Sequence, residues 1–88
     1  MEVVILETVK RRSEEKLTGC FVCKNKETAE EVAGHLEGSE LYGTAAPFSA
    51  DVDEDIVVEN KKQNEFSSFT LSYSKYTKLI DDGKIKYL

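Results

Sequence analysis

The middle of the chain holds a run of carboxylates, Asp51-Val52-Asp53-Glu54-Asp55, that begins like a calcium-binding loop. Such a loop has a glycine at its sixth position for a sharp turn and a glutamate at its twelfth position that gives two ligand oxygens. This chain has Ile56 and Lys62 at those positions. The run therefore does not match the calcium-binding loop of an EF-hand. Three interpretations stay open: a solvated acidic edge, a strip that binds a partner, and a weak, adventitious site for a divalent cation.

A second candidate is the pair Cys20 and Cys23, which has the C-x-x-C spacing of redox centres and of half a zinc site. The surrounding residues predict a strand, in which side chains three positions apart point to opposite faces. A redox pair needs its two sulfurs together, which this geometry does not allow. A zinc site needs four ligands, and His35 is the only histidine in the sequence. The pattern favours two structural cysteines, and a small metal-dependent or redox factor is an alternative function.

The other residue types that support catalysis occur without the neighbours they need. His35 follows Glu31 by one helical turn, which favours a surface ion pair over a general base. No serine has the Gly-x-Ser-x-Gly context of a hydrolase nucleophile, and no glycines have the spacing of a phosphate-binding loop. We therefore expect no catalytic residue, no cofactor and no metal site, and we predict that the protein is not an enzyme.

Charge is distributed unevenly along the 88 residues, whose formal net charge is −5. Residues 1–25 carry five bases and four acids, residues 26–60 carry one base and ten acids, and residues 61–88 carry six lysines and three acids. Such asymmetry favours a surface of one sign that steers a basic partner. The predicted partner-binding residues are Glu27, Glu30, Glu31, Glu37, Asp51, Asp53, Glu54 and Asp55.

The spacing of the acidic run suggests a particular kind of partner. In an extended chain Asp51, Asp53 and Asp55 would recur on one side about 6.6 Å apart, which is similar in order to the spacing of phosphates along a DNA strand. The sequence thus predicts a non-enzymatic acidic binding protein. In its sharper form this is a DNA mimic, an inhibitor that occupies the basic DNA-binding surface of a nucleoid-associated or histone-like protein, a polymerase or a nuclease. An assembly module that binds through a sheet edge is the other alternative.

Composition also bounds the setting in which the protein works. Small, acidic proteins with few motifs are typical of phages and mobile elements. Direct binding of nucleic acid is not expected, because it usually demands a basic face. Glu2 and Glu7 enclose the first apolar run, so we expect no signal peptide. No apolar stretch approaches the roughly 18 residues of a membrane span. We expect a cytoplasmic protein, in the host cell if it is phage-encoded, that binds no membrane.

The elements that must position these residues begin with a hairpin and a helix. Residues 3–10 and 17–24 have the composition of two paired strands, joined by a charged turn at 11–15. Apolar residues at positions 29, 32, 33 and 36 give residues 26–37 the single apolar face of an amphipathic helix. Asn25 is its predicted N-cap and Gly38 its predicted stop. The glutamates lie off the apolar face, so we expect them to face water.

The second half of the chain is predicted to complete a sheet. Gly43 and Pro47 favour a loop or an irregular edge strand over 41–50, and Ile56-Val57-Val58 favours a strand. The later predicted elements are a turn at 61–64, a short strand at 66–71, a helix from Ser72 or Ser74 to Asp82, and a strand at 84–88. The predicted fold class is α+β, with a small, mainly antiparallel sheet of about four or five strands and two helices. The order is approximately ββα(β)β(β)αβ, in a single domain over 1–88.

Overall fold

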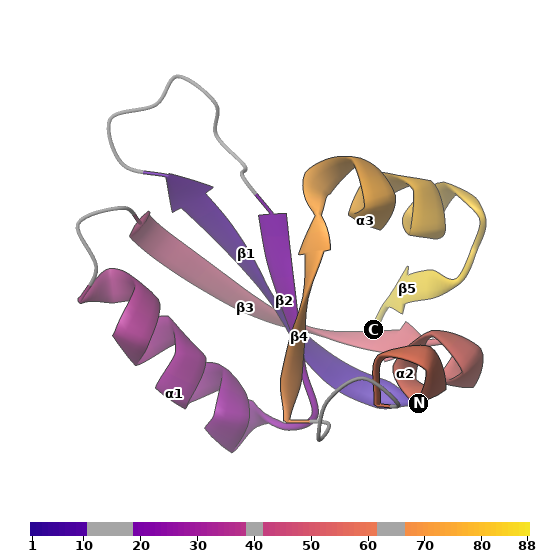
Figure 1. Cartoon of the computed structure of the whole chain (residues 1–88), viewed down its shortest axis with the longest axis horizontal. Coiled ribbons are helices and arrows are strands. Elements are labelled where there is room, and N and C mark those ends of the chain that lie inside the picture. Colours follow the sequence, from indigo (N-terminus) through magenta and orange to yellow (C-terminus); the bar gives the residue numbers. More distant parts are fainter. Residues whose placement is uncertain (11–18, 39–41, 62–66) are drawn as a thin grey trace.

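A five-stranded antiparallel sheet forms the framework of the computed structural model, in the strand order β4-β2-β1-β3-β5 (Figure 1). The strands are β1 (Glu2–Lys10), β2 (Gly19–Cys23), β3 (Tyr42–Val52), β4 (Ser68–Ser72) and β5 (Ile85–Tyr87). The structure describes residues 1–10, 19–38, 42–61 and 67–88, without the side chains of residues 9, 10 and 42–45. β1 is the central strand, paired with β2 on one side and with β3 on the other. Its side chains contribute to the core on both faces of the sheet.

Three helices cover the two faces of this sheet, and the element order is ββαβαβαβ. Helix α1 (Lys26–Glu37) packs on one face, against Leu6 and Cys23. Helices α2 (Glu54–Lys61) and α3 (Tyr73–Asp81) pack on the opposite face. We call these the α1 face and the α2–α3 face. The prediction of a small α+β fold with a mainly antiparallel sheet is confirmed. None of the described helices is long and apolar enough to cross a membrane.

The apolar run at the start of β1 follows from this two-sided cover. Val3 and Ile5 point into the core of the α2–α3 face, whereas Leu6 is buried on the α1 face and Val4 packs against it. A strand with only one buried face alternates between apolar and polar residues, but a strand with two buried faces needs apolar residues at successive positions. The run that ends before Glu7 is therefore the sequence of a central strand.

Local signals set the ends of two helices as the sequence predicts. The Asn25 side chain accepts a hydrogen bond of 2.8 Å from the Thr28 amide and caps α1. The Ser72 hydroxyl accepts one of 3.3 Å from the Lys75 amide and caps α3. Beyond α3, Gly83 adopts a φ of +75°, which only glycine reaches without strain. Each cap satisfies a backbone group that the helix leaves unpaired.

The strand predicted at residues 56–58 is wrong, because this segment forms α2. Ile56 and Val57 are buried at adjacent positions while Val58 is 42% exposed. Adjacent burial fits a helix that lies flat on one face of a sheet, whereas a strand would need cover on both of its faces to bury two adjacent residues. Glu54 and Asp55 occupy its first turn, where carboxylates favour the positive end of the helix dipole. These tertiary and terminal effects outweigh the weak β-propensity of three branched residues.

The segment predicted as a loop or irregular edge strand is the long strand β3. It pairs with β1 from Asp51 opposite Glu2 to Tyr42 opposite Lys10, with an irregularity near the latter end. β5 pairs with β3 only from Ala50 to Val52. In the described residues the outer edge of β3 therefore has no strand partner at Pro47, and a proline is tolerated at such an edge. The predicted turn at 11–15 and the part of the predicted turn at 62–64 lie outside the described residues.

Candidate functional site

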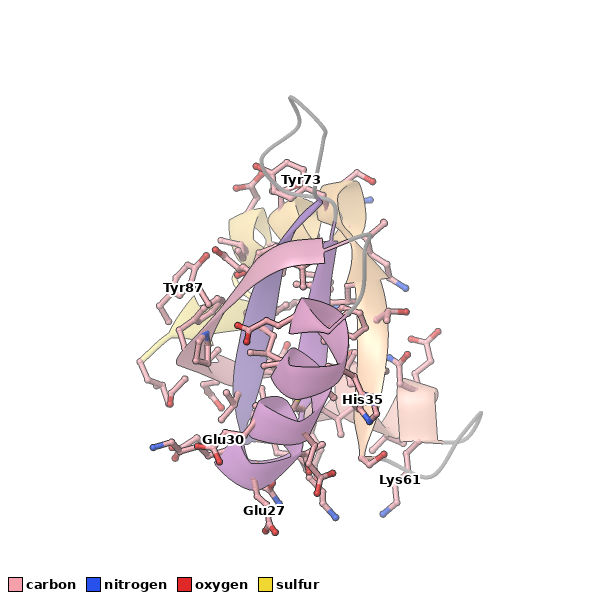
Figure 2. All side chains as sticks on the ribbon, turned by 90° about the vertical axis from the view of Figure 1, so that its left-hand side faces the viewer. Glu27, Glu30, His35, Lys61, Tyr73 and Tyr87 are labelled. Carbon is pink, nitrogen blue, oxygen red and sulfur yellow. The ribbon has the colours of Figure 1, made fainter. Side chains whose placement is uncertain are left out.

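Four of the predicted partner-binding residues project from the outer side of α1. Glu27, Glu30, Glu31 and Glu37 are exposed, whereas Ala29 is buried against the sheet. At 3.6 residues per turn, Glu27 and Glu31 lie opposite the buried side of the helix, whereas Glu30 and Glu37 share one flank of it. Figure 2 shows Glu30 at one side of α1 and Glu27 at the lower end of the helix. We call these four residues the α1 acidic surface.

The acidic run at residues 51–55 does not form an extended row. Asp51 belongs to β3, whereas Glu54 and Asp55 lie in the first turn of α2. The expectation that Asp51, Asp53 and Asp55 recur on one side of an extended chain is therefore wrong. Because α1 and α2 pack on opposite faces of the sheet, the structure also does not bring the α1 glutamates and the carboxylates of α2 into one layer.

Positive groups close to the acidic run offset part of its negative charge. The amino terminus of Met1 lies 2.8 Å from Asp51 Oδ1 and also donates a hydrogen bond of 2.8 Å to the Val52 carbonyl. The hydrogen bond to Asp51, with Glu54 and Asp53 nearby, raises the pKa of this amine, and the same bond lowers the pKa of Asp51. Lys84 Nζ lies 3.6 Å from Asp55. These contacts make the run a weaker electrostatic attractor than its sequence suggests.

A hollow of about 350 Å³ lies between the start of β1 and the residues that lead into α1. Lys24 and Lys26 lie at its rim, together with Glu2 on the neighbouring strand. Two exposed lysines thus lie around the same hollow as Glu2, whose cross-strand partner is Asp51. Their positive charge offsets part of the negative charge of that pair.

The two cysteines lie on opposite faces of the sheet, as predicted. Cys20 is buried in the core of the α2–α3 face and Cys23 in that of the α1 face. Burial, with a smaller effect of Glu7, raises the pKa of Cys20 to about 12, and burial raises the pKa of Cys23 to about 11. Both sulfurs therefore stay protonated at neutral pH, and a thiol is a poor nucleophile and a poor metal ligand. The described residues hold no group of three or more histidine, cysteine or acidic side chains placed to bind a metal ion.

A second hollow, of about 290 Å³, lies over Gly19 between β1 and the edge strand β4. Its polar lining consists of hydroxyl groups from Thr8, Thr70 and Ser72, and Thr8 Oγ1 donates a hydrogen bond of 3.1 Å to the Gly19 carbonyl. Cys20 is the one residue of this lining with a titratable side chain. Since the raised pKa of Cys20 keeps it protonated, this lining supplies no general base.

One cluster of interacting side chains is absent from the predicted sites. The Tyr76 hydroxyl lies 3.3 Å from Glu7 Oε1 and 2.9 Å from the Tyr87 hydroxyl. The Phe48 and Tyr87 ring centroids are 4.9 Å apart with the planes tilted by 42°. The sequence contains one indication of this cluster. Side chains alternate along a strand, so Glu7 lies on the same face as Val3 and Ile5, which is the face that helices cover.

Comparison with protein-family models, with curated proteins and with solved structures finds no match to this chain.

Proposed function

We propose that this protein is a non-enzymatic docking protein whose α1 acidic surface binds a basic protein surface in the manner of a DNA mimic. The observation that carries the proposal is the outer side of α1. It exposes four glutamates, and residues 27–37 contain no lysine or arginine. The helix is held by its apolar side, so the carboxylates are presented on a rigid element and not on a loop.

The spacing of these carboxylates supports a partner that normally binds phosphates. Glu27 and Glu31 are about 6 Å apart along the helix axis, and Glu27 and Glu37 about 15 Å, at about 1.5 Å per residue. Phosphates of one DNA strand follow one another at a similar order of distance. A row of lysines or arginines that fits a DNA backbone is therefore spaced to meet several of these glutamates at once.

Electrostatics gives such a surface selectivity more than strength. Each exposed ion pair contributes about 0–1 kcal/mol, so several pairs together chiefly speed encounter and select a basic partner. The partner class that fits is a nucleoid-associated or histone-like protein, a polymerase or a nuclease. We propose that the protein acts in the cytoplasm, which is that of the host cell if the protein is phage-encoded.

The test is competition with DNA for purified proteins of these three classes. A fluorescent duplex bound to each protein is titrated with this chain at about 0.1 M salt, where screening extends over roughly 10 Å, and anisotropy reports the displaced duplex. We expect the chain to displace DNA from one of them without binding the duplex itself. The variant E27Q/E30Q/E31Q should compete about tenfold less well, since three weak ion pairs are lost.

A matched variant changes the same number of charges elsewhere. E59Q/D81N/D82N removes three exposed acids from the elements on the α2–α3 face and should compete like the parent. If the α1 variant competes as well as the parent, or if both variants lose the same amount, the α1 acidic surface is not the docking surface. Failure to displace DNA from every class would also refute the proposal.

A second candidate function is assembly through the edge strand β4, favoured by its composition. Ser68-Phe69-Thr70-Leu71-Ser72 contains no charge and no proline, and in the described part of the chain β4 pairs with β2 alone. The other open edges carry protective features, because β5 has three residues including Lys86 and the open part of β3 contains Pro47. Binding that persists at about 0.5 M salt would favour this function over docking by charge.

A further inference from the structure

Glu7 is a charged residue in the middle of the central strand. It points to the α2–α3 face beside Cys20, its cross-strand partner on β2, yet it is half-buried and not enclosed. On the other side its partner is Ala46, an exposed residue whose methyl group leaves room above the sheet. Helix α3 packs over β2, β4 and β5, so the part of β1 and β3 around Glu7 lies beside the helix.

A chain of hydroxyl groups is directed at the Glu7 carboxylate. A phenol has one proton, so when Tyr76 donates to Glu7 Oε1 its oxygen can only accept, and the proton between the two tyrosines comes from Tyr87. Desolvation is the main cause that raises the pKa of Tyr76, which keeps its hydroxyl a donor. Tyr76 thus donates to Glu7 Oε1, and Tyr87 donates in turn to the Tyr76 oxygen. Within the described part of the chain, no cation lies within ion-pair distance of Glu7.

Two aromatic residues lie near this carboxylate, because Phe48 is diagonal to Glu7 across the β1–β3 pair and the Tyr87 hydroxyl bonds to that of Tyr76. Tyr76 is buried at 2% exposure, but Tyr87 remains 55% exposed although its ring packs on Phe48. Figure 2 shows Tyr87 at the rim of the molecule. Ring faces attract cations within about 6 Å of the centroid, and an alkylammonium group also gains from apolar contact with the ring. A small inorganic cation gains less, because it keeps its own water.

We propose that Glu7, Phe48 and Tyr87 form a binding site for an alkylammonium group. The carboxylate supplies the counter-charge, the two exposed or half-buried rings supply cation–π and apolar contact, and Tyr76 is a positioning residue that holds Glu7 through its hydroxyl. The ligand is a lysine side chain, free or methylated, or a small organic ammonium ion. The site lies on the α2–α3 face, so it is independent of the α1 acidic surface on the other side of the sheet.

The test is a titration of the isotopically labelled protein with tetramethylammonium chloride, followed by NMR. We expect saturable shifts at Glu7, Phe48 and Tyr87 with a millimolar dissociation constant, and no saturable shifts with potassium chloride at the same ionic strength. The variant E7Q keeps an acceptor for the Tyr76 hydroxyl and should bind about tenfold more weakly. E2Q, which removes a carboxylate from the same strand on the α1 face, should bind like the parent.

Two amino-acid derivatives, acetylated and amidated so that only the side chain carries charge, then identify the source of the ammonium group. Binding of an acetylated, amidated lysine or trimethyllysine more tightly than tetramethylammonium points to a protein partner, and weaker binding points to a small molecule. Equal shifts with potassium, or equal affinity of E7Q and the parent, would overturn the site. E27Q/E30Q/E31Q should retain tetramethylammonium binding, so failure of this site and failure of docking through α1 are measured separately.

Discussion

Replacing Tyr76 by phenylalanine removes one hydroxyl from the core and leaves the ring that fills it. Tyr76 is among the largest fully buried side chains, and its hydroxyl connects α3 to Glu7 on β1 and to Tyr87 on β5. The substitution breaks both hydrogen bonds without creating a cavity under the ring. It therefore isolates the polar contribution of the cluster from its packing.

The magnitude follows from what each partner can do after the change. A neutral hydrogen bond contributes about 0.5–1.5 kcal/mol, and a bond to a charged group about 1.5–3 kcal/mol. Glu7 is half-buried and Tyr87 is exposed, so water recovers part of both losses. We expect Tyr76→Phe to lower the free energy of unfolding by about 1–2 kcal/mol. In a small domain with a total of about 5 kcal/mol, this lowers Tm by roughly 4–15 °C.

Urea denaturation followed by circular dichroism measures this change, with Tyr73→Phe as the matched control. Tyr73 lies one turn earlier on the same helix and is 47% exposed, so the same chemical change there should cost less than about 0.5 kcal/mol. A double-mutant cycle of Tyr76→Phe with E7Q should show a coupling of at least about 0.5 kcal/mol. Equal effects of the two tyrosine substitutions, or no coupling to Glu7, would refute the reasoning.

Two further predictions concern the helix cap and the thiols. Asn25→Ala removes the acceptor that caps α1 and should lower the free energy of unfolding by about 1 kcal/mol in the same urea assay, whereas Asn25→Asp keeps a side-chain acceptor and should retain most of this stability. Cys20 and Cys23 should resist a thiol reagent at pH 8 until the protein unfolds. In the folded protein their pKa values, about 12 and about 11, lie above the ordinary value of a thiol. Their contribution to stability should therefore be complete below pH about 8.5 and decline as the pH rises toward these values. Rapid labelling of the folded protein by the thiol reagent would contradict the burial of both thiols.

The sequence predicts the elements whose signals are local. The apolar spacing of α1, the Asn25 cap, the Ser72 cap and the glycine after α3 each act within one or two turns, and the structure has them where the sequence places them. The opposite orientation of the two cysteines also follows from strand geometry alone. Exposure of the α1 glutamates required no more than the period of the helix.

Contacts between distant segments decided the rest. Ile56-Val57-Val58 is compatible with a strand or a helix, and only the space above the sheet selects α2. That choice also separates the carboxylates of residues 54–55 from those of α1, which charge counting along the chain could not reveal. Glu7 and Tyr76 are 69 positions apart in the sequence, and they meet because the sheet places β1 next to β2, over which α3 packs. Such a site depends on strand order, and strand order is set by burial of the whole sheet and not by any single segment.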